Sequence, residues 1–264
     1  MRCRACGALY PDRFPTPASL PDAYHRYYTD RPPRPRHGFG PRALVNRTRR
    51  DYLRRALPGD AGRVLDFGCG SGAFLALVAA VRPDAKLFGT DFRSPPQGLI
   101  QFEWLAPEAL EEAAPFDWIT LGHVLEHVAD PSALVSRLAS LLAPGGGLWI
   151  STPNADGFLL GSAGPWSRDI DFPRHRSVFT RLALRQLLIE CGLEAEDLPS
   201  PRLNASLTTL ATLANIARDR AGSPRERVWA ALKTAFGLVR HTLTPPRGRR
   251  VSSPEIVVVC RREV

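Results

Sequence analysis

The chain lacks several features that would place it in particular protein classes. Its 264 residues contain no run approaching the ~18 apolar residues that a membrane-spanning helix needs. Its first residues do not show the charged and then apolar segments of a secretory signal. The five cysteines are odd in number and show no paired framework, which disfavours a disulfide scaffold. We therefore expect a soluble cytoplasmic protein that is not exported.

Lysine is almost absent, because Lys86 and Lys233 are the only two and arginine supplies the rest of the positive charge. The formal net charge of +9 is unevenly placed: residues 31–55 hold nine arginines and one acid, and a second basic run covers 218–250. Such flanks attract nucleic acid, anionic lipid or an acidic carrier protein. A coding bias toward arginine would produce the same pattern, with the arginines simply solvated. A binding surface for an anionic partner and a coding bias without function both stay open.

Short apolar segments alternate with helical patterns through the middle of the chain. Of all residues, 44% are hydrophobic and 23% charged, which is enough apolar material for one substantial core. We expect helices at 41–57, 72–81, 131–142 and 180–191, a loop at 152–178, and strands at 63–67, 86–90, 99–104, 116–121, 147–151, 193–198 and 255–261. Such alternation predicts an α/β fold with a doubly wound, mostly parallel seven-stranded sheet covered on both faces.

Two segments extend this core. Residues 1–40, with the C-x-x-C pair Cys3 and Cys6, predict an N-terminal arm docked on a main domain of residues 41–264. Zinc needs four ligands and no second C-x-x-C pair is present, so we expect no metal site. Residues 203–246 predict a helical insertion of two amphipathic helices before the last strand. A substrate lid, a homodimer face, a patch that lies on an anionic membrane and ordinary packing are its open alternatives.

The strongest local signal is VLDFGCGSGAFL, residues 64–75, in which a buried strand runs into a glycine-rich turn and then a helix. Glycine permits a positive φ and lets the backbone approach a ligand closely. Gly68, Gly70 and Ala73 also satisfy the G-x-G-x-x-A form of a dinucleotide-binding turn. A nicotinamide-dependent oxidoreductase is therefore an alternative at this point.

Two carboxylates favour a different ligand. Asp66 stands two residues before the first glycine, where it suits a cationic amino group and would repel a pyrophosphate. Asp91 ends the next strand, where it can accept hydrogen bonds from both hydroxyls of a ribose. The pair favours a nucleoside that carries an amino acid.

Four segments occur in a familiar order: VLDFGCGSGAFL, GTD, FDWITLGHVLEHVADP and LLAPGGGLWISTPN. In them the chain resembles the class I S-adenosylmethionine-dependent methyltransferases, a likeness that covers residues 60–200 and the final strand. WSRDIDFPRHRSVFT resembles a subgroup that methylates sugars and other small molecules. The resemblance implies a Rossmann-like methyltransferase fold and S-adenosylmethionine as cofactor.

The resemblance also implies where the cofactor binds. Four residues line its methionine part: Asp66, Gly68, Cys69 and Gly70. Asp91 holds the ribose. Phe92 and Trp104 flank the adenine unless they are core aromatics. His123 contacts the cofactor mainly through its backbone. The implied cofactor-binding residues are Asp66, Gly68, Cys69, Gly70, Ser71, Gly72, Asp91, Phe92, Trp104 and His123.

The acceptor side has two candidate catalytic residues. A sulfonium is an activated methyl donor, so the enzyme must mainly position the acceptor and, for a hydroxyl, remove its proton. His175 lies on the loop after the fifth expected strand and His127 follows the fourth, and both also have structural interpretations. We expect Arg174 and Arg176 to keep the imidazole of His175 neutral.

Other functions fit less well. A dehydrogenase does not explain LGHVLEHV or the APGG turn. Methyltransferases of nucleic-acid bases usually carry a (D/N)-P-P-(Y/F/W) element where this chain has Gly122-His123-Val124-Leu125, so nucleic acid is not expected as the substrate. A hydroxyl on a sugar, a natural product or a lipid-linked molecule is the expected acceptor. A methyltransferase fold kept as a non-catalytic binding protein is the remaining alternative.

Overall fold

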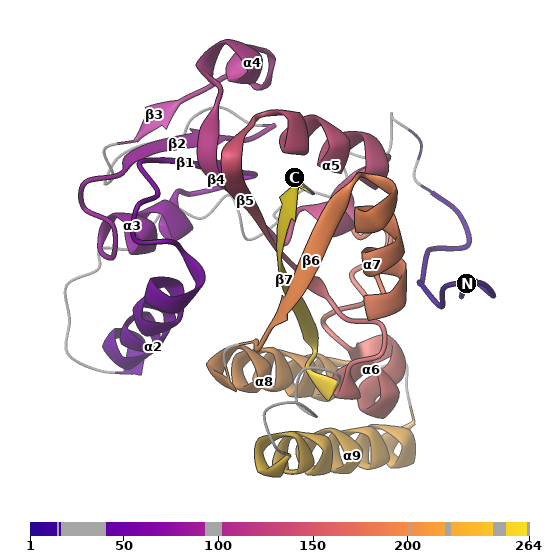
Figure 1. Cartoon of the computed structure of the whole chain (residues 1–264). Coiled ribbons are helices and arrows are strands. Elements are labelled where there is room, and N and C mark those ends of the chain that lie inside the picture. Colours follow the sequence, from indigo (N-terminus) through magenta and orange to yellow (C-terminus); the bar gives the residue numbers. More distant parts are fainter. Residues whose placement is uncertain are drawn as a thin grey trace.

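The computed structural model of the chain describes residues 1–14, 16, 41–92, 102–200, 202–219, 223–244 and 252–262 (Figure 1). Residues 17–40 of the expected N-terminal arm lie outside these ranges. So do residues 99–101, with which the third strand was expected to begin.

Within the described residues, seven strands form one sheet in the order β3-β2-β1-β4-β5-β7-β6. Their bounds are β1 Arg63–Phe67, β2 Lys86–Thr90, β3 Glu103–Trp104, β4 Phe116–Gly122, β5 Leu142–Pro153, β6 Leu193–Leu198 and β7 Glu255–Arg262. β7 runs antiparallel to both of its neighbours, β5 and β6, and the pairs among β1 to β5 are parallel. The predicted mostly parallel seven-stranded sheet is confirmed.

Of the helices in the described residues, six agree with the predicted ones to within a few residues, and two, α4 and α6, were not predicted. They are α2 Pro41–Ala56, α3 Ala73–Ala79, α4 Leu110–Ala113, α5 Pro131–Ser140, α6 Phe158–Ala163, α7 Arg181–Glu190, α8 Arg202–Arg218 and α9 Pro224–Leu243. Short 3₁₀ turns are η2 Pro107–Ala109, η3 Leu125–His127 and η4 Gly164–Trp166. Asp130 and Thr180 cap α5 and α7, because each side chain accepts a hydrogen bond from a backbone N–H of the first turn.

The expectation of a loop over residues 152–178 was wrong in part. β5 continues to Pro153, and the segment then contains α6 and η4. Six residues are too few for a helix that is stable alone. Leu159 and Ala163 of α6 are buried, and α6 packs against α8 and α9. These tertiary contacts, which local periodicity does not reveal, stabilise the helix.

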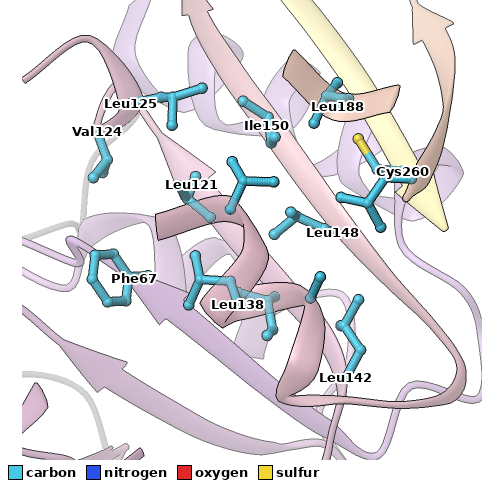
Figure 2. Close-up of a cluster of buried hydrophobic side chains, with 14 of the residues drawn as sticks. Phe67, Leu121, Val124, Leu125, Leu138, Leu142, Leu148, Ile150, Leu188 and Cys260 are labelled. Atoms are coloured by element: carbon cyan, nitrogen blue, oxygen red, sulfur yellow. The ribbon is translucent and has the colours of Figure 1, made fainter. Parts of the chain in front are cut away.

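Two apolar clusters cover the two faces of the sheet. Along β1 the side chains alternate, so that Leu65 and Phe67 join one cluster and Val64 joins the other. The first cluster includes α5 and α7, and Figure 2 shows part of it, with Leu138 of α5 facing Leu148 of β5. The second cluster includes residues of α2 and α3. The sheet is therefore covered on both faces, as predicted.

The first ten residues dock on the edge of this core. Leu9 forms a β-bridge with Val178, and the hydroxyl of Thr180 donates a hydrogen bond to the carbonyl of Cys6 at 2.5 Å. No third histidine, cysteine or carboxylate among the described residues completes a metal-ligand group with Cys3 and Cys6. The described part of the arm is thus attached to the main domain.

The insertion before the last strand consists of α8 and α9, as predicted. α9 begins with a capping box in which Ser223 and Glu226 exchange hydrogen bonds. In the described part of the chain, no helix has both the length and the apolar character needed to cross a membrane.

Candidate active site

The turn between β1 and α3 exposes bare backbone at the carboxyl end of the sheet. Gly68, Gly70 and Gly72 have φ values of 78°, 52° and 70°, which other residues rarely adopt. The carbonyl of Thr90, at the end of β2, accepts hydrogen bonds from the N–H groups of Gly68 and Cys69 at 2.8 and 3.0 Å. A Cβ atom at Gly70 would have no heavy atom within 4 Å. The turn is therefore held in place while its outer side stays open.

Asp66 is buried at the end of β1, directly before this turn. It lies in register with Thr120 of β4, whose hydroxyl donates a hydrogen bond to Asp66 Oδ1 at 2.8 Å. Burial raises the pKa of Asp66 to about 7, helped by the charge of Asp91 and opposed by the Thr120 hydrogen bond. Near neutral pH, a cation beside this carboxyl would draw it to the ionised form.

Asp91 follows β2 and holds the turn from the other side. Its Oδ2 accepts a hydrogen bond from the N–H of Gly70 at 2.9 Å. The two carboxylates at the ends of adjacent strands therefore lie on two sides of the same turn.

The two aromatic residues expected at the adenine differ in their surroundings. Phe92 is 74% exposed beside Asp91, and its ring meets Phe67 edge-on with centroids 6.1 Å apart. Trp104 pairs with Gly89 in the β2–β3 register and packs, half-buried, against the second apolar cluster. Phe92 is thus the more accessible of the two for stacking.

The neighbouring polar positions of the turn are not reactive groups. Burial raises the pKa of the Cys69 thiol, so it stays protonated and behaves as a small apolar side chain. Ser71 is half-buried and Gly72 immediately precedes α3. What these residues offer a ligand is the shape of their backbone.

His123, the residue after β4, is held in a strained conformation. Of the described non-glycine residues it alone has a positive φ, 57°, which costs ~1–2 kcal/mol. Its N–H donates a hydrogen bond to the carbonyl of Ser151 at 2.8 Å. Nδ1 lies 3.2 Å from Oε1 of Glu126 and Nε2 lies 3.4 Å from Oε1 of Glu255, while 51% of the side chain is exposed. An accessible imidazole is therefore clamped between two buried carboxylates.

The clamp sets the charge of this imidazole. Packing around the ring disfavours its charged form, but the hydrogen bonds and negative charges of Glu126 and Glu255 outweigh that effect and raise the pKa of His123 well above its ordinary value. Burial acts against ionisation of both carboxyls too. The His123 hydrogen bond and charge overcome it, so the pKa of Glu126 is lowered and that of Glu255 falls to about 2.

Hydroxyl and amide groups complete the clamp. Thr152 donates a hydrogen bond to Oε2 of Glu126 at 3.0 Å. Glu255 accepts hydrogen bonds from Ser151, from Ser200 at 2.8 Å and from Asn204 of α8 at 3.1 Å. Both carboxylates are satisfied, which is what buried charges require.

His127 and His175, the candidate bases of the sequence analysis, pack against each other with ring centroids 4.7 Å apart. Nδ1 of His127 lies 3.0 Å from the carbonyl oxygen of Arg174, and Nδ1 of His175 lies 2.9 Å from that of Asp169. The pKa of His175 is lowered, as expected, but its first cause is burial. The guanidinium of Arg174 instead pairs with Asp171. Both rings tie the loop after β5 to the end of β4.

One atom each from Glu126, His127 and His175 lie within 4.8 Å of one another, the one group in the described residues with the composition of a metal site. Both carboxylate oxygens of Glu126 already contact His123 and Thr152. In this arrangement the three side chains hold neighbouring residues in place through hydrogen bonds. The expectation of no metal stays a prediction.

Comparison with known families decides the identity of the chain. Residues 42–198, more than half of its length, match a family described as a methyltransferase domain. The chain belongs to this family. The class I fold and S-adenosylmethionine as methyl donor, both expected from the resemblance, are confirmed at this level.

Two curated relatives show how far the likeness extends. The methyltransferase is 36% identical over 139 residues to a ubiquinone biosynthesis O-methyltransferase of Xylella fastidiosa (strain 9a5c), covering 47% of this chain and 52% of the relative. It is 35% identical over 137 residues to a trans-aconitate 2-methyltransferase of Azoarcus sp. (strain BH72), covering 49% of each chain. The chain thus spans about half the length of the curated relatives it matches.

Among solved structures, a cyclopropane-fatty-acyl-phospholipid synthase-like protein from Lactobacillus casei ATCC 334 matches with a TM-score of 0.52. The match covers 85% of this methyltransferase and 94% of that chain at 15% identity. At this identity the likeness establishes a common fold.

The structure joins the two sides of the site through one contact. A Cβ atom at Gly68 would lie 2.4 Å from Cγ2 of Val124, the residue after His123. The glycine turn and the His123 clamp are therefore neighbours at the carboxyl ends of β1 and β4. His127 and His175 belong to the same region through Glu126.

Sequence reasoning missed Glu126 and Glu255 as site residues. Glu255 does carry a signal, because it is an acid that opens an otherwise apolar strand, EIVVVC. Glu126 carries no comparable sequence signal, because a glutamate in a short 3₁₀ turn can equally well be exposed on the surface.

The same contact yields a stability prediction. We expect Gly68→Ala to lower the free energy of unfolding by ~2–5 kcal/mol, from the left-handed backbone and the clash with Val124. Gly70→Ala, at a positive φ in open space, should cost only ~1–2 kcal/mol. Urea unfolding without cofactor measures both. Gly68→Ala should also cost less in a Val124→Ala background, and equal costs at the two glycines would contradict the clash.

Proposed function

We propose that this methyltransferase moves the methyl group of S-adenosylmethionine to a hydroxyl of a small-molecule acceptor. The observation that carries the proposal is the position of His123. Its imidazole is half exposed and clamped between two buried carboxylates, and the next residue, Val124, packs against Gly68 of the glycine turn. In its neutral form this imidazole can take a proton, and it belongs to the segment that packs on the backbone proposed to hold the cofactor.

The residues of the turn fit the cofactor. A buried carboxyl with a pKa of about 7, as at Asp66, is suited to the ammonium of the methionine part, and Asp91 to the ribose hydroxyls. Gly68, Gly70 and Gly72 would let the ligand approach the backbone, and Phe92 would stack on the adenine. When bound, the cofactor supplies a methyl group activated by a sulfonium. Trp104 and the backbone of His123 complete the proposed contacts.

The acceptor side would use His123 as general base. The neutral imidazole would accept the proton of the acceptor hydroxyl, and Glu126 and Glu255 would stabilise the imidazolium. The bound cofactor would supply the methyl group and leave as the thioether S-adenosylhomocysteine. Because the same carboxylates raise the pKa of His123, the neutral imidazole becomes more abundant as the pH rises above neutrality.

His175 and His127 are the second candidates for this role. Burial keeps His175 neutral, and neutral imidazole is the form that accepts a proton. Their Nδ1 contacts with backbone carbonyls make them better suited to fix the loop after β5.

Oxygen is the proposed methylated atom for a second reason. The Xylella fastidiosa relative is named an O-methyltransferase, and it shares 36% identity over the matched region. We propose an acceptor among sugars, natural products and lipid-linked molecules, with nucleic acid not a substrate. We also propose that the protein acts in the cytoplasm. We further propose that the chain divides into an arm (1–40) and a main domain (41–264).

Ligand-induced stabilisation tests the cofactor half of the proposal. At 100 times its Kd a ligand adds ~2.7 kcal/mol, or about 5 to 11 °C in Tm for a domain of this size. We expect that shift with S-adenosylmethionine and S-adenosylhomocysteine and none with NAD. A shift with NAD alone would instead indicate an oxidoreductase.

Transfer of a labelled methyl group to panels of phenols, sugar hydroxyls, carboxylates and amines then tests the chemistry. Labelled products should be ethers. If the folded, cofactor-binding protein labels only carboxylates or amines, the hydroxyl assignment is wrong. Binding without transfer to any member of a broad panel would favour a non-catalytic binding protein.

A further inference from the structure

α9 is packed on one side and apolar on the other. Its inner side holds the buried residues Ala230, Thr234 and His241. His241 stacks on Phe158 of α6 with ring centroids 5.3 Å apart, and Gly237 lies against the same ring, where a Cβ would come within 2.7 Å. These contacts leave the opposite side of the helix facing outward. Figure 1 shows α9 at the edge of the molecule, with α8 and α6 between it and the sheet.

Six large apolar side chains occupy that outward side. They are 54% to 80% exposed, and five of them recur at intervals of three and four residues, which places them in one stripe. The six are Val228, Trp229, Leu232, Phe236, Val239 and Leu243. From Val228 to Leu243 the stripe extends about 23 Å along the helix axis. Scattered apolar residues are normal on a surface, whereas a continuous stripe of this length marks a contact site.

Basic residues border the stripe. Lys233 and Arg240 are exposed and lie next to it at helical spacing, and Arg225 stands in the first turn. The one acid of α9, Glu226, is engaged in the capping box with Ser223. The whole chain carries a formal charge of +9. An apolar stripe with a cationic border and a tryptophan matches helices that lie in the plane of an anionic membrane surface.

A second copy of the chain suits this surface less well. A two-fold contact through the stripe would bring Lys233 and Arg240 of one copy toward the same residues of the other, and like charges disfavour such a contact. Anionic lipid headgroups complement these charges, and acyl chains complement the stripe.

We propose that α9 docks the methyltransferase on an anionic phospholipid bilayer, with its apolar stripe at the boundary between headgroups and acyl chains. α8 packs on α9, and Asn204 of α8 donates a hydrogen bond to Glu255 of the His123 clamp. Docking therefore places the acceptor side of the site near molecules dissolved in the bilayer. Only this last consequence rests on the proposed function.

Vesicle sedimentation of the full chain, without cofactor or acceptor, tests the docking. At low salt we expect the protein to pellet with vesicles of mixed phosphatidylcholine and phosphatidylglycerol and to stay in solution with phosphatidylcholine alone. Raising the salt concentration should weaken binding, because part of the attraction is electrostatic. Equal binding to neutral vesicles, or none to anionic ones, overturns the proposal.

Two variants locate the contact. Leu232→Glu with Phe236→Glu should lower the partition coefficient by on the order of 100-fold, since the double change removes buried apolar area and adds negative charge. Ile189→Glu on α7 is the matched control, because Ile189 is 71% exposed on a different helix and should bind as the wild type does. If the double variant does not fold, Lys233→Glu with Arg240→Glu should likewise abolish binding to anionic vesicles.

Light scattering supplies the competing outcome. If the wild type is a dimer that Leu232→Glu with Phe236→Glu converts to a monomer, and the wild type does not sediment with anionic vesicles, a second copy covers the stripe and the proposal is wrong. Because every readout is independent of turnover, failure of the docking and failure of the proposed function are distinguishable.

Discussion

His123→Asn is expected to lower kcat by about 10²- to 10⁴-fold, the usual contribution of a general base. Asparagine is chosen because it tolerates the left-handed backbone at this position better than alanine does, so the turn after β4 should persist. The Kd for S-adenosylmethionine should stay near the wild-type value, since the proposed cofactor contact of residue 123 is made by its backbone. Single-turnover methyl transfer and calorimetry measure the two quantities separately.

The pH profile separates a base from a structural residue. In the wild type, kcat should rise with pH through the raised pKa of His123, because only the neutral imidazole accepts the proton. Glu255→Gln removes one of the charges that raise this pKa, so the rise should move to lower pH. A His123→Asn enzyme with undiminished kcat would remove His123 from the mechanism. If His175→Asn alone abolishes turnover while cofactor binding persists, His175 is the base.

Asp66→Asn is expected to weaken S-adenosylmethionine binding by about 10- to 150-fold, which corresponds to the ~1.5–3 kcal/mol of a hydrogen bond to a charged group. In the wild type the affinity should increase as the pH rises through the Asp66 pKa of about 7, because the ionised carboxylate is the form that holds the ammonium. Binding near pH 7 should therefore release a proton, which calorimetry in buffers of different ionisation enthalpy detects. Asp66→Asn should bind without this pH dependence.

Asp91→Asn is the control for this effect. The amide oxygen can still accept the hydrogen bond from the N–H of Gly70, so the turn should be retained and the affinity should still change with pH. A wild-type affinity that is flat between about pH 6 and pH 8 contradicts the role of Asp66 as a titrating partner of a cation.

The same pKa shift has a consequence for the unliganded protein. Because burial raises the pKa of Asp66 above its unfolded value of 3.8, the folded chain holds this proton more tightly than the unfolded chain does. The contribution of Asp66 to stability is therefore largest below about pH 4 and is lost as the pH rises to about 7.

Much of the fold was predictable from particular segments. β1, β2 and β6 occupy the predicted residues, because short apolar runs between turn residues have few other solutions in a protein of this size. The glycine turn, with Asp66 and Asp91 on its two sides, was likewise predictable, because a strand end, positive φ values and the position of a carboxylate are local properties.

Other features depended on distant contacts. α6 was missed because a six-residue helix is stabilised by its packing on α8 and α9 rather than by its own periodicity. Whether the apolar stripe of α9 is buried or exposed was also ambiguous, because an amphipathic pattern does not show which face of the helix packs against the protein. The buried residues Ala230, Thr234 and His241, the last stacked on Phe158 of α6, identify the inner face.

The sequence by itself determined the elements of the sheet, their order along the chain and the glycine turn between Asp66 and Asp91, because these follow from periodicity and from residues adjacent in the chain. The tertiary structure alone decided the clamp around His123, which is the proposed acceptor half. β7 pairs antiparallel with β5, and this pairing brings Glu255 to Ser151 and to the side chain of His123. No spacing along the chain encodes that meeting, because it depends on which strand lies beside β5 and in which direction it runs.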